Sequence, residues 1–325
     1  MKTVAIKGFG RIGRCFLRML FSKNQSSFIV TNIVEKTLDI NACAYLLKYD
    51  SSYGESDFEV EIKKNILILS QNGKTWRIQV FKSEKNISAD VCLDASGSEK
   101  KADCQCNSYS FIIYTYFVKD VDGYFLGNKV ISKINKPKTL FGGICDSVSL
   151  VPILLKVNPC DIERIYIVTM HPFLAYQNLL DGPSFDKEQI QVGRSSFNNV
   201  IPKQSTVLSI LYYLVPYFKE KIIFNTYRIP TNVVTTCDIN IQFKHNIDDE
   251  IIECIKNEIE VLKKDELPHV SLDFVRLENE VYGIDATCSS IINKNLHLTL
   301  FYNNELTYVN YLYRMMLVLF GIDNQ

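Results

Sequence analysis

A glycine-rich segment directly after a short apolar strand constrains the fold of this chain more than any other feature of its sequence. Thr3–Ile6 is a β-branched run that predicts a strand, and Gly8-Phe9-Gly10-Arg11-Ile12-Gly13 follows it. Apolar residues then recur at the spacing of one helix face, at Ile12, Phe16, Met19 and Leu20. A second apolar strand, Phe28–Val34, ends at Glu35. A strand, a tight turn, a helix and a strand in this order predict an α/β fold with a parallel sheet.

The three glycines of this segment have separate roles in a dinucleotide-binding fingerprint. Gly8 allows the turn, Gly10 lets the backbone approach a pyrophosphate, and Gly13 lets the helix pack against the strand. Glu35 follows at about the 20-residue offset of the acid that accepts hydrogen bonds from the adenosine ribose. A carboxylate there would repel a 2′-phosphate, which favours NAD over NADP, whereas Lys36 beside it favours the reverse. A glycine-rich turn in an ordinary α/β domain is the alternative, and the order of strand, helix and acid argues against it.

Composition excludes several classes of protein. The 325 residues carry 36 basic and 36 acidic side chains, so the chain has no excess of positive charge for a nucleic-acid surface. Its length predicts about two domains. No apolar stretch reaches the ~18 residues that a membrane helix needs, since the longest are Phe111–Val118 and Met315–Ile322. We therefore expect a cytoplasmic protein that binds neither nucleic acid nor membrane.

The number and spacing of the cysteines predict free thiols rather than a disulfide framework. Ten in a chain of this size are too sparse for a disulfide framework, and most are expected to pack in the core. The one close pair, Cys104 and Cys106, lacks the spacing of a zinc knuckle, and no second pair or nearby histidine completes four ligands. The sequence therefore predicts no metal site.

Several segments resemble the glyceraldehyde-3-phosphate dehydrogenase family. The segment that begins at Gly8 is similar to the opening of these enzymes, and other similar segments follow in the family's order over nearly the whole chain. They are Leu46–Gly54, with its Tyr-Asp-Ser sequence; Asp181–Ser184, Gly193–Arg194 and Asn199–Pro202, which resemble the S-shaped loop; Tyr227–Thr231, which resembles Arg-Val-Pro-Thr; and Phe301–Glu305 with Tyr308.

This resemblance implies a Rossmann-type dinucleotide-binding domain and an α+β catalytic domain with a mostly antiparallel sheet. We expect the NAD-binding domain at 1–144, with a C-terminal helix at 305–325 packing back on it, and the catalytic domain at 145–304. The S-shaped loop lies between subunits in this family, so the resemblance also implies a homotetramer. Apolar runs predict strands of the second domain at Arg164–Met170, Thr235–Phe243 and His297–Tyr302, and a final helix within Asn303–Phe320.

The resemblance also implies a mechanism. In this family a cysteine thiolate attacks an aldehyde carbonyl, a histidine moves protons, the nicotinamide accepts hydride, and phosphate cleaves the thioester. The cysteine falls at Cys145 and the histidine at His171. Cys145 stands before the apolar helix Leu150–Val157, and a helix start and a neighbouring imidazolium both lower a thiol pKa, so we expect it to be the most reactive thiol. A buried inert thiol and a surface histidine are the alternatives, and the matching flanking residues argue against them.

Further cofactor residues follow from the same resemblance. Asn304 and Tyr308 would orient the nicotinamide. Ser96 and Gly97 would complete the cofactor site, together with the residues of the glycine-rich segment and Glu35. The cofactor is therefore expected to be NAD.

The sequence departs from the family pattern beside the nucleophile, where the acyl-accepting phosphate binds. The two flanking hydroxyls become Ile144 and Asp146. The Asp146 carboxylate would oppose a bound phosphate or the thiolate. Alternatively, it satisfies free N–H groups in the first turn of its helix, where Asp is favoured. Ser205 retains one hydroxyl of this site, while Thr206 replaces a glycine.

The subsite for the substrate's own phosphate is also altered. Arg228 is retained there, and one arginine can clamp a carboxylate or a phosphate through two hydrogen bonds. Leu174 and Tyr176 replace a threonine and an aspartate of the family pattern. The substrate is therefore expected to be more apolar or shorter than a triose phosphate.

Three functions compete on this sequence. The first is an NAD-dependent aldehyde dehydrogenase of this family with altered phosphate sites. The sequence leaves open whether phosphate or water releases the acyl group, and the lost donors favour water. The second is a catalytically impaired NAD-binding interaction or regulatory protein of the same fold, favoured by the lost hydroxyls and opposed by the retention of Cys145, His171 and Arg228. The third is the glycolytic enzyme itself, or the closely similar erythrose-4-phosphate dehydrogenase, in a fast-evolving lineage. The sequence leaves the aldehyde and the physiological direction open.

Overall fold

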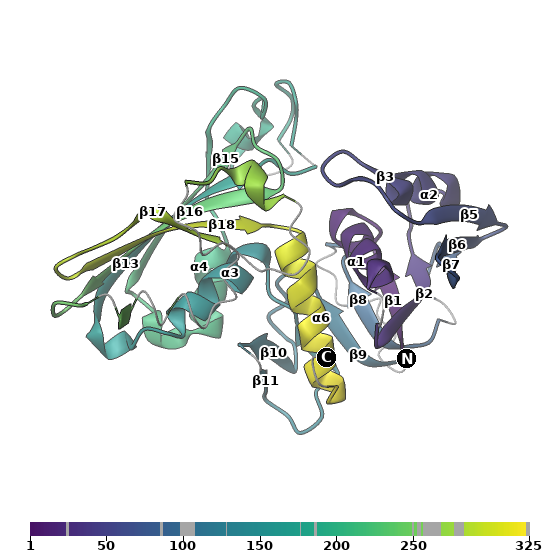
Figure 1. Cartoon of the computed structure of the whole chain (residues 1–325), viewed down its shortest axis with the longest axis horizontal. Helices are drawn as coiled ribbons and strands as arrows, with labels where there is room; N and C mark the ends of the chain where they lie inside the picture. Colours follow the sequence, from purple (N-terminus) through teal and green to yellow (C-terminus); the bar gives the residue numbers. More distant parts are fainter. Residues whose placement is uncertain are drawn as a thin grey trace. The chain divides into compact units, whose positions relative to one another are not determined.

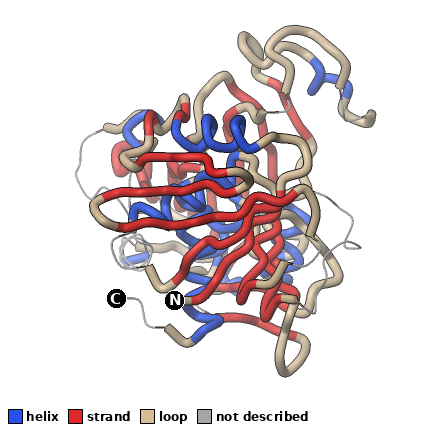
Figure 2. The backbone as a smooth tube through the Cα atoms, turned by 90° about the vertical axis from the view of Figure 1, so that its right-hand side faces the viewer, coloured by secondary structure: helices blue, strands red, loops and turns tan. Residues whose placement is uncertain are grey.

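The computed structural model describes residues 1–23, 26–84, 87–97, 108–127, 129–175, 177–184, 187–248, 250–251, 255, 268–275 and 283–322. The chain divides into two compact units. The first unit comprises Met1–Ile144 with Tyr308–Gln325, and the second comprises Cys145–Thr307. Strands make up most of the regular structure in both (Figure 2).

The first unit is built on a ten-stranded sheet. Its seven adjacent strands from β10 to β7 run parallel, and antiparallel strands follow at both edges. In spatial order the strands are β11 (Lys129–Ser132), β10 (Gly123–Leu126), β12 (Thr139–Phe141), β9 (Tyr109–Tyr114), β8 (Ala89–Asp94), β1 (Lys2–Lys7), β2 (Phe28–Val34), β7 (Lys74–Phe81), β6 (Ile66–Gln71) and β5 (Glu59–Lys63). A two-stranded ribbon of β3 (Tyr49–Asp50) and β4 (Gly54–Glu55) accompanies this sheet.

The central strand β1 explains why this sheet forms. Its Val4, Ala5 and Ile6 are fully buried, as expected for a parallel strand covered on both faces. The chain pairs β1 with β2 on one side and with β8 on the other, so the strand order reverses beside β1. The carboxyl ends of strands at such a point form the usual ligand-binding edge of a doubly wound sheet.

Among the described residues of the first unit, three α-helices lie wholly or mostly within it, and Figure 1 labels each of them. α1 (Arg11–Ser22) is strongly amphipathic and buries Phe16 and Leu20 against the sheet. α2 (Ile40–Lys48) begins at an Asp39 cap, whose carboxylate accepts the Ala42 N–H. α6 (Leu306–Phe320) is the last helix of the chain.

Aromatic side chains pack α6 onto the parallel sheet of the first unit. Tyr311 meets Phe125 of β10 with ring centroids 5.1 Å apart, and its hydroxyl also donates to the Phe125 carbonyl. Phe320 meets Phe111 of β9 edge to face at 5.3 Å. The last helix therefore completes the core of the unit that contains the N-terminus.

The second unit contains a six-stranded sheet. Only β13 and β15 pair in parallel, and the other neighbours are antiparallel, as predicted for the second domain. In spatial order the strands are β14 (Ile201–Lys203), β15 (Ile222–Ile229), β13 (Ile162–Pro172), β16 (Val234–Phe243), β18 (Asn295–Asn303) and β17 (Gly283–Ile292). The predicted strands at 164–170, 235–243 and 297–302 lie within β13, β16 and β18.

Two α-helices of the second unit, α3 (Cys145–Leu154) and α4 (Val207–Leu214), pack against each other. α3 is apolar on nearly all sides, which is typical of a buried helix. Short 3₁₀ turns complete this unit at Pro159–Asp161, Ile190–Gly193, Pro216–Phe218 and Ser271–Phe274.

The final helix lies within the predicted segment Asn303–Phe320 and is shorter than the range 305–325 expected for the C-terminal helix. It begins at Leu306, because the Asn303 side chain ends β18 and accepts the Glu305 and Leu306 N–H groups, both at 3.0 Å. It ends at Phe320, because Gly321 adopts φ +61° and the Ile322 N–H bonds back to Leu317, as in a glycine-ended helix. None of the described helices is long and apolar enough to cross a membrane.

Candidate active site

The glycine-rich turn lies at the carboxyl end of β1 and opens α1. Gly8 has φ +87°, and a Cβ there would lie 2.6 Å from the Ser96 backbone, so only glycine fits. A Cβ on Gly13 would lie 2.4 Å from the Gly8 carbonyl oxygen, so the third glycine lets the helix approach the turn. Gly10 caps the helix and faces open space. The first turn of α1 contains no acidic residue, so nothing in it opposes a bound phosphate.

Glu35 locks the glycine-rich turn from the neighbouring strand. Its Oε2 accepts the Phe9 N–H at 2.9 Å, and its Oε1 accepts the N–H groups of Thr37 and Leu38 and the Thr37 hydroxyl. Burial raises the pKa of this carboxyl, but the four donors outweigh that effect and hold the pKa at about 2. Glu35 is therefore ionised, and Oε2 retains a lone pair that a ribose hydroxyl could use.

The other predicted cofactor residues of the first unit support this turn. Arg11 Nη1 donates to Asp50 Oδ2 at 2.7 Å, so the Tyr-Asp-Ser segment holds its guanidinium. The Ser96 hydroxyl donates to Asp94 Oδ1 at 2.6 Å. Phe9 is fully buried and Ile12 is half-buried, while Gly97, at φ +65°, leaves open space above its backbone. Their roles toward a cofactor remain predictions.

A buried charge cluster lies at the end of β1. Lys7 Nζ is 2.9 Å from Glu84 Oε1 and 3.2 Å from Asp94 Oδ2, and all three side chains are buried. Because one ammonium lies between two carboxylates, the cluster depends on Lys7 to hold both acids in the interior. Lys7 stands where the family pattern has an asparagine, and the sequence alone did not indicate these partners.

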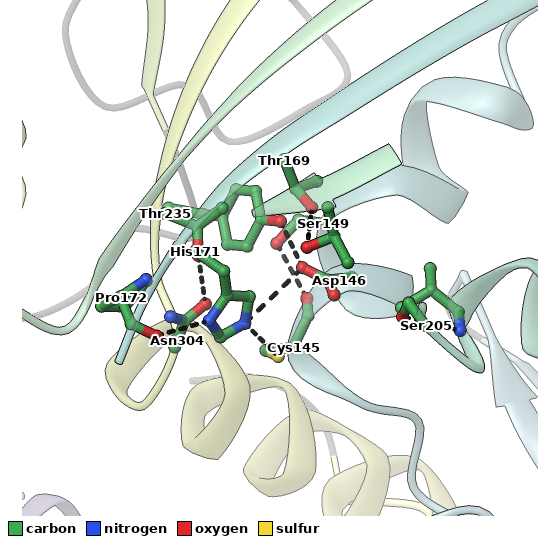
Figure 3. A network of polar contacts seen from close by, with 12 residues as sticks. Cys145, Asp146, Ser149, Thr169, His171, Pro172, Ser205, Thr235 and Asn304 are labelled. Carbon is green, nitrogen blue, oxygen red and sulfur yellow. Dashed lines mark hydrogen bonds and ion pairs between the residues drawn. The ribbon is translucent and has the colours of Figure 1, made fainter. Parts of the chain in front are cut away.

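Cys145 and His171 meet within the second unit. Cys145 is the first residue of α3, and His171 lies near the end of β13. Cys145 Sγ lies 3.4 Å from His171 Nε2, and His171 Nδ1 lies 3.1 Å from the Pro172 carbonyl oxygen (Figure 3). A carbonyl only accepts, so Nδ1 carries the proton and the Nε2 lone pair faces the thiol. The structure therefore brings the two predicted catalytic residues into hydrogen-bond contact.

Asp146 faces this pair rather than the N–H groups of its own helix. Its Oδ1 accepts a 2.5 Å hydrogen bond from the Tyr302 hydroxyl and lies 3.9 Å from His171 Nε2 (Figure 3). Asp146 and Tyr302 are both buried. Of the two alternatives for Asp146, the structure therefore favours the one in which the carboxylate opposes an anion beside the nucleophile.

The pKa values of Cys145 and His171 differ from the prediction of a low thiol pKa. Burial and the Asp146 charge raise the pKa of the Cys145 thiol, and they outweigh Arg228 and the N–H groups at the start of α3, which lower it. Burial also lowers the pKa of His171 to about 4, against the opposing effect of Asp146. The predicted low thiol pKa is thus wrong for the resting site, first because the thiol is buried and then because the Asp146 charge lies beside it.

Arg228 lies beside His171 on the neighbouring strand, because β15 pairs in parallel with β13 at this register. Its Nη1 donates to the Pro172 carbonyl at 3.2 Å, and among the described residues its buried Nε has no acceptor. Ser205 is placed differently: its hydroxyl accepts the Val207 N–H at the start of α4. In Figure 3 it lies outside the network around His171. The structure thus joins Arg228, but not Ser205, to the catalytic pair.

Asn304 and Tyr308 have distinct environments. Asn304 Oδ1 accepts the Thr235 hydroxyl at 2.9 Å, and its buried Nδ2 has no acceptor among the described residues. The Tyr308 hydroxyl donates to the Gly143 carbonyl at 2.8 Å, so it supports the segment that precedes Cys145. Asn304 therefore retains a donor for a ligand, and Tyr308 has a structural contact in addition to its predicted role.

Tyr302 is the site residue that sequence reasoning missed. It lies within the segment Phe301–Glu305 that resembles the family, but nothing in the sequence linked its hydroxyl to Asp146. Its position near the end of β18, directly before Asn303 and Asn304, gave only a weak signal. Tyr176, Cys104 and Cys106 lie outside the described residues, so their predicted roles are not addressed.

A glycine-rich turn at the reversal point of a doubly wound sheet is typical of dinucleotide-dependent enzymes. A cysteine at a helix start in contact with a histidine on a mostly antiparallel sheet is typical of enzymes that act through a thiol. Residues 2–102 match the model described as "Glyceraldehyde 3-phosphate dehydrogenase, NAD binding domain", and residues 144–304 match the "C-terminal domain" of the same family. The chain belongs to the glyceraldehyde-3-phosphate dehydrogenase family, and the predicted cofactor NAD is confirmed by the first of these matches.

Individual relatives resemble the whole chain. The chain is 26% identical over 326 residues to glyceraldehyde-3-phosphate dehydrogenase 1 of Kluyveromyces marxianus, covering 95% of this chain and 96% of the relative. It is 27% identical to glyceraldehyde-3-phosphate dehydrogenase of Buchnera aphidicola, with 94% and 95% covered. With the Clostridium pasteurianum enzyme of the same name the identity is 28%, and 97% of each chain is covered.

Proposed function

We propose that this protein is an NAD-dependent dehydrogenase that oxidises an aldehyde through a thioester on Cys145. The observation that carries the proposal is the 3.4 Å contact between Cys145 Sγ and His171 Nε2, with the imidazole tautomer fixed by the Pro172 carbonyl. Relatives named glyceraldehyde-3-phosphate dehydrogenase match nearly the full chain, which supports the same reaction class.

The first step follows from this contact. As Cys145 Sγ attacks the aldehyde carbon, the thiol proton passes to His171 Nε2, and the resulting imidazolium protonates the former carbonyl oxygen. Nε2 then takes that hydroxyl proton back as the thioester forms. The nearby Asp146 carboxylate favours the imidazolium between these transfers, at 3.9 Å from Nε2.

Residues of each unit, taken separately, suit a different part of NAD. The open backbone at Gly10 and the start of α1 suit a pyrophosphate, and Glu35 suits a ribose hydroxyl. The buried Nδ2 of Asn304 suits the carbonyl oxygen of the nicotinamide carboxamide, because Thr235 already holds Oδ1. When bound, NAD supplies the acceptor for the hydrogen and electron pair that leave the substrate carbon.

Arg228 defines the substrate class. Its buried Nε and its position beside His171 support binding of an anionic group close to the reacting carbon. Leu174, which by resemblance belongs to the same subsite, offers no hydroxyl, and this supports a single clamp rather than a phosphate subsite with several donors. We therefore propose a short aldehyde with one anionic group.

Water is the proposed acyl acceptor. Ile144 offers no side-chain donor to a phosphate, and Asp146 would add repulsion close to the thioester. Ser205 uses its hydroxyl oxygen at the start of α4. Loss of a charge-assisted hydrogen bond costs about 1.5–3 kcal/mol, so two lost donors and a like charge weaken phosphate strongly.

Assembly and location are proposed by analogy. The segment between Asp181 and Pro202 resembles the family's intersubunit loop, and several of its apolar side chains are exposed, among them Ile190, Phe197 and Val200. This supports a homotetramer. A cytoplasmic location is supported by a relative from Gracilaria gracilis that is named as cytosolic.

The deciding experiment measures NADH formation with a panel of short aldehydes, with and without an anionic group, across a phosphate series. We expect turnover with an anionic aldehyde and initial rates that do not respond to phosphate. Arg228→Ala should raise KM for that aldehyde much more than it raises KM for a neutral aldehyde of the same length. A saturable increase with phosphate would reject water as the acceptor. No turnover with any aldehyde would reject the proposed function.

A further inference from the structure

Three potential metal ligands of different chemistry converge where α3 begins. One ligand atom each from Cys145, Asp146 and His171 can be chosen so that all three lie within 4.8 Å of one another. In the described part of the chain this is the one group of three such residues. The sequence predicted no metal site, because the pair Cys104 and Cys106 lacks the spacing of a zinc knuckle, and it left open whether the Asp146 carboxylate faces Cys145.

Two of the three separations between these ligand atoms are close to those of a tetrahedral zinc site, and the third lies within 4.8 Å. Zinc binds a thiolate at about 2.3 Å, an imidazole at about 2.0–2.1 Å and a carboxylate at about 2.0–2.2 Å, which places tetrahedral ligand atoms about 3.4–3.6 Å apart. The observed Sγ to Nε2 distance is 3.4 Å, and the Nε2 to Oδ1 distance is 3.9 Å. Small side-chain rotations would therefore complete three of four positions, leaving one for water.

Both outer contacts that zinc ligands usually have are already in place. The Pro172 carbonyl accepts the His171 Nδ1 proton, which directs the Nε2 lone pair at the site. The Tyr302 hydroxyl donates to Asp146 Oδ1 and orients the carboxylate. A histidine and a carboxylate held in this way from outside are characteristic of metal sites.

The charges of the site also favour a dication. Asp146 is buried, and its polar partners among the described residues are Tyr302 and His171, neither of which carries a permanent positive charge. A thiolate at Cys145 would add a second negative charge beside it. Arg228, on the strand beside His171, already supplies one positive charge near the pair, and a doubly positive ion compensates the negative charge that remains once the thiolate forms. The mixed thiolate, imidazole and carboxylate set suits zinc better than magnesium or calcium.

We propose that Cys145, Asp146 and His171 form a zinc site that holds the nucleophile in an inactive form. On binding, Zn²⁺ forms bonds to Sγ, Nε2 and one Asp146 oxygen, the Cys145 thiol proton is released to solvent, and one water stays on the ion. The metal occupies the sulfur and nitrogen atoms needed for attack on the aldehyde. The inhibitory consequence rests on the proposed function, but binding of the metal does not.

Metal binding is tested on the full-length protein by titration with Zn²⁺ against a chromophoric chelator, and with Co²⁺ as a spectroscopic probe. We expect one equivalent per chain and a thiolate-to-cobalt charge-transfer band that Cys145→Ser abolishes. Asp146→Asn, which keeps the side-chain shape, should weaken zinc at least tenfold. Tyr302→Phe, which keeps the buried ring, should weaken it by about 10- to 100-fold.

A matched control exists in the same unit. His297 Nε2 also lies 3.9 Å from a carboxylate oxygen, that of Asp238, but this pair is not part of the three-residue group. Asp238→Asn should leave zinc affinity and the cobalt spectrum unchanged. An equal loss of affinity in Asp238→Asn, or a charge-transfer band that survives in Cys145→Ser, would overturn the proposed ligands.

Inhibition is tested separately, with the aldehyde identified in the activity panel. Zinc near one equivalent should abolish turnover, and a chelator should restore it. Turnover that persists in the zinc-loaded protein would overturn the inhibitory role. If no aldehyde is turned over but the metal titration behaves as expected, the proposed function fails while the zinc site stands.

Discussion

The N-termini of α1 and α3 carry the same partial positive charge but differ in the negative group that lies beside them. α1 begins at Gly10, has no acidic residue in its first turn and faces open space there. α3 begins at Cys145, carries Asp146 in its first turn and buries that carboxylate. A helix N-terminus attracts negative charge in both cases. The start of α1 is open to an anion of a bound ligand, whereas the start of α3 already has the Asp146 carboxylate beside it. Membership of the family therefore does not predict that the two helix starts bind phosphate groups equally well.

Removal of the Cys145 thiol at the start of α3 should have the largest effect, and it should leave the site at the start of α1 unchanged. Cys145→Ser should lower kcat by about 10⁴-fold, because an uncharged serine hydroxyl is a far weaker nucleophile beside a neutral imidazole. The affinity for NAD should not change, because the glycine-rich turn belongs to the first unit. Stopped-flow kinetics and calorimetric titration of NAD measure the two quantities. A parallel loss of NAD affinity would contradict this separation.

The next largest effect is expected for the buried charge cluster of Lys7, Glu84 and Asp94 at the end of β1. Lys7→Met should lower the free energy of unfolding by about 3–5 kcal/mol, because Glu84 and Asp94 lose the ammonium between them. Urea unfolding at pH 7 measures it. Lys2→Met is the control, since Lys2 forms a 3.5 Å ion pair on a much more exposed surface. Equal effects of the two substitutions would show that the cluster contributes no more than a surface pair.

Gly10→Asp makes the start of α1 resemble that of α3. The protein should remain folded, because Asp is a favourable cap residue and Gly10 has the extended backbone of a cap. NAD affinity should fall by about 100-fold, because a carboxylate would face the pyrophosphate at close range. Gly10→Asn is the uncharged control, and equal losses in both variants would assign the effect to size rather than charge.

A smaller effect is expected from Glu35 in acid. Because its pKa is lowered to about 2, its stabilising contribution is complete above the ordinary value near 4.5 and is lost as the pH falls toward 2. Over that interval the free energy of unfolding of the wild-type protein should fall by about 2 kcal/mol more than that of Glu35→Gln. Urea midpoints of both proteins from pH 6 to 2.5, an interval chosen for measurement, provide the comparison. Parallel pH profiles would contradict it.

The smallest effect makes α3 resemble α1. Asp146→Thr restores the family's hydroxyl and removes a charge that raises the Cys145 pKa, so alkylation of Cys145 by iodoacetamide at pH 7.5, an assay condition, should speed up by about tenfold. Chelator-treated protein is labelled and the peptides are mapped. The exposed Cys160 provides the internal control, and its rate should not change. An unchanged Cys145 rate would mean that burial alone sets its reactivity.

Local patterns explain what the sequence could predict. Phe28–Val34 forms β2 as expected, because a β-branched run without breakers has few alternatives. Each glycine of the turn has the role expected from backbone geometry. The contact between Asp146 and Tyr302 joins residues 156 positions apart, and neither residue carries a local signal of it. The raised pKa of Cys145 likewise depends on burial that only the packed second unit defines.

The position of α6 has a consequence for synthesis of the protein. Tyr308, Tyr311 and Phe320 complete the packing of the first unit, although they are made after every strand of both sheets. A chain that has left the ribosome only as far as Thr307 lacks the hydroxyl that holds the Gly143 carbonyl, two residues before the nucleophile. The first unit therefore cannot finish folding while only its N-terminal segment has been synthesised. The apolar sheet face that α6 covers stays exposed until this last helix is made. Chaperones that shield nascent apolar surfaces should hold this chain until its synthesis is nearly complete.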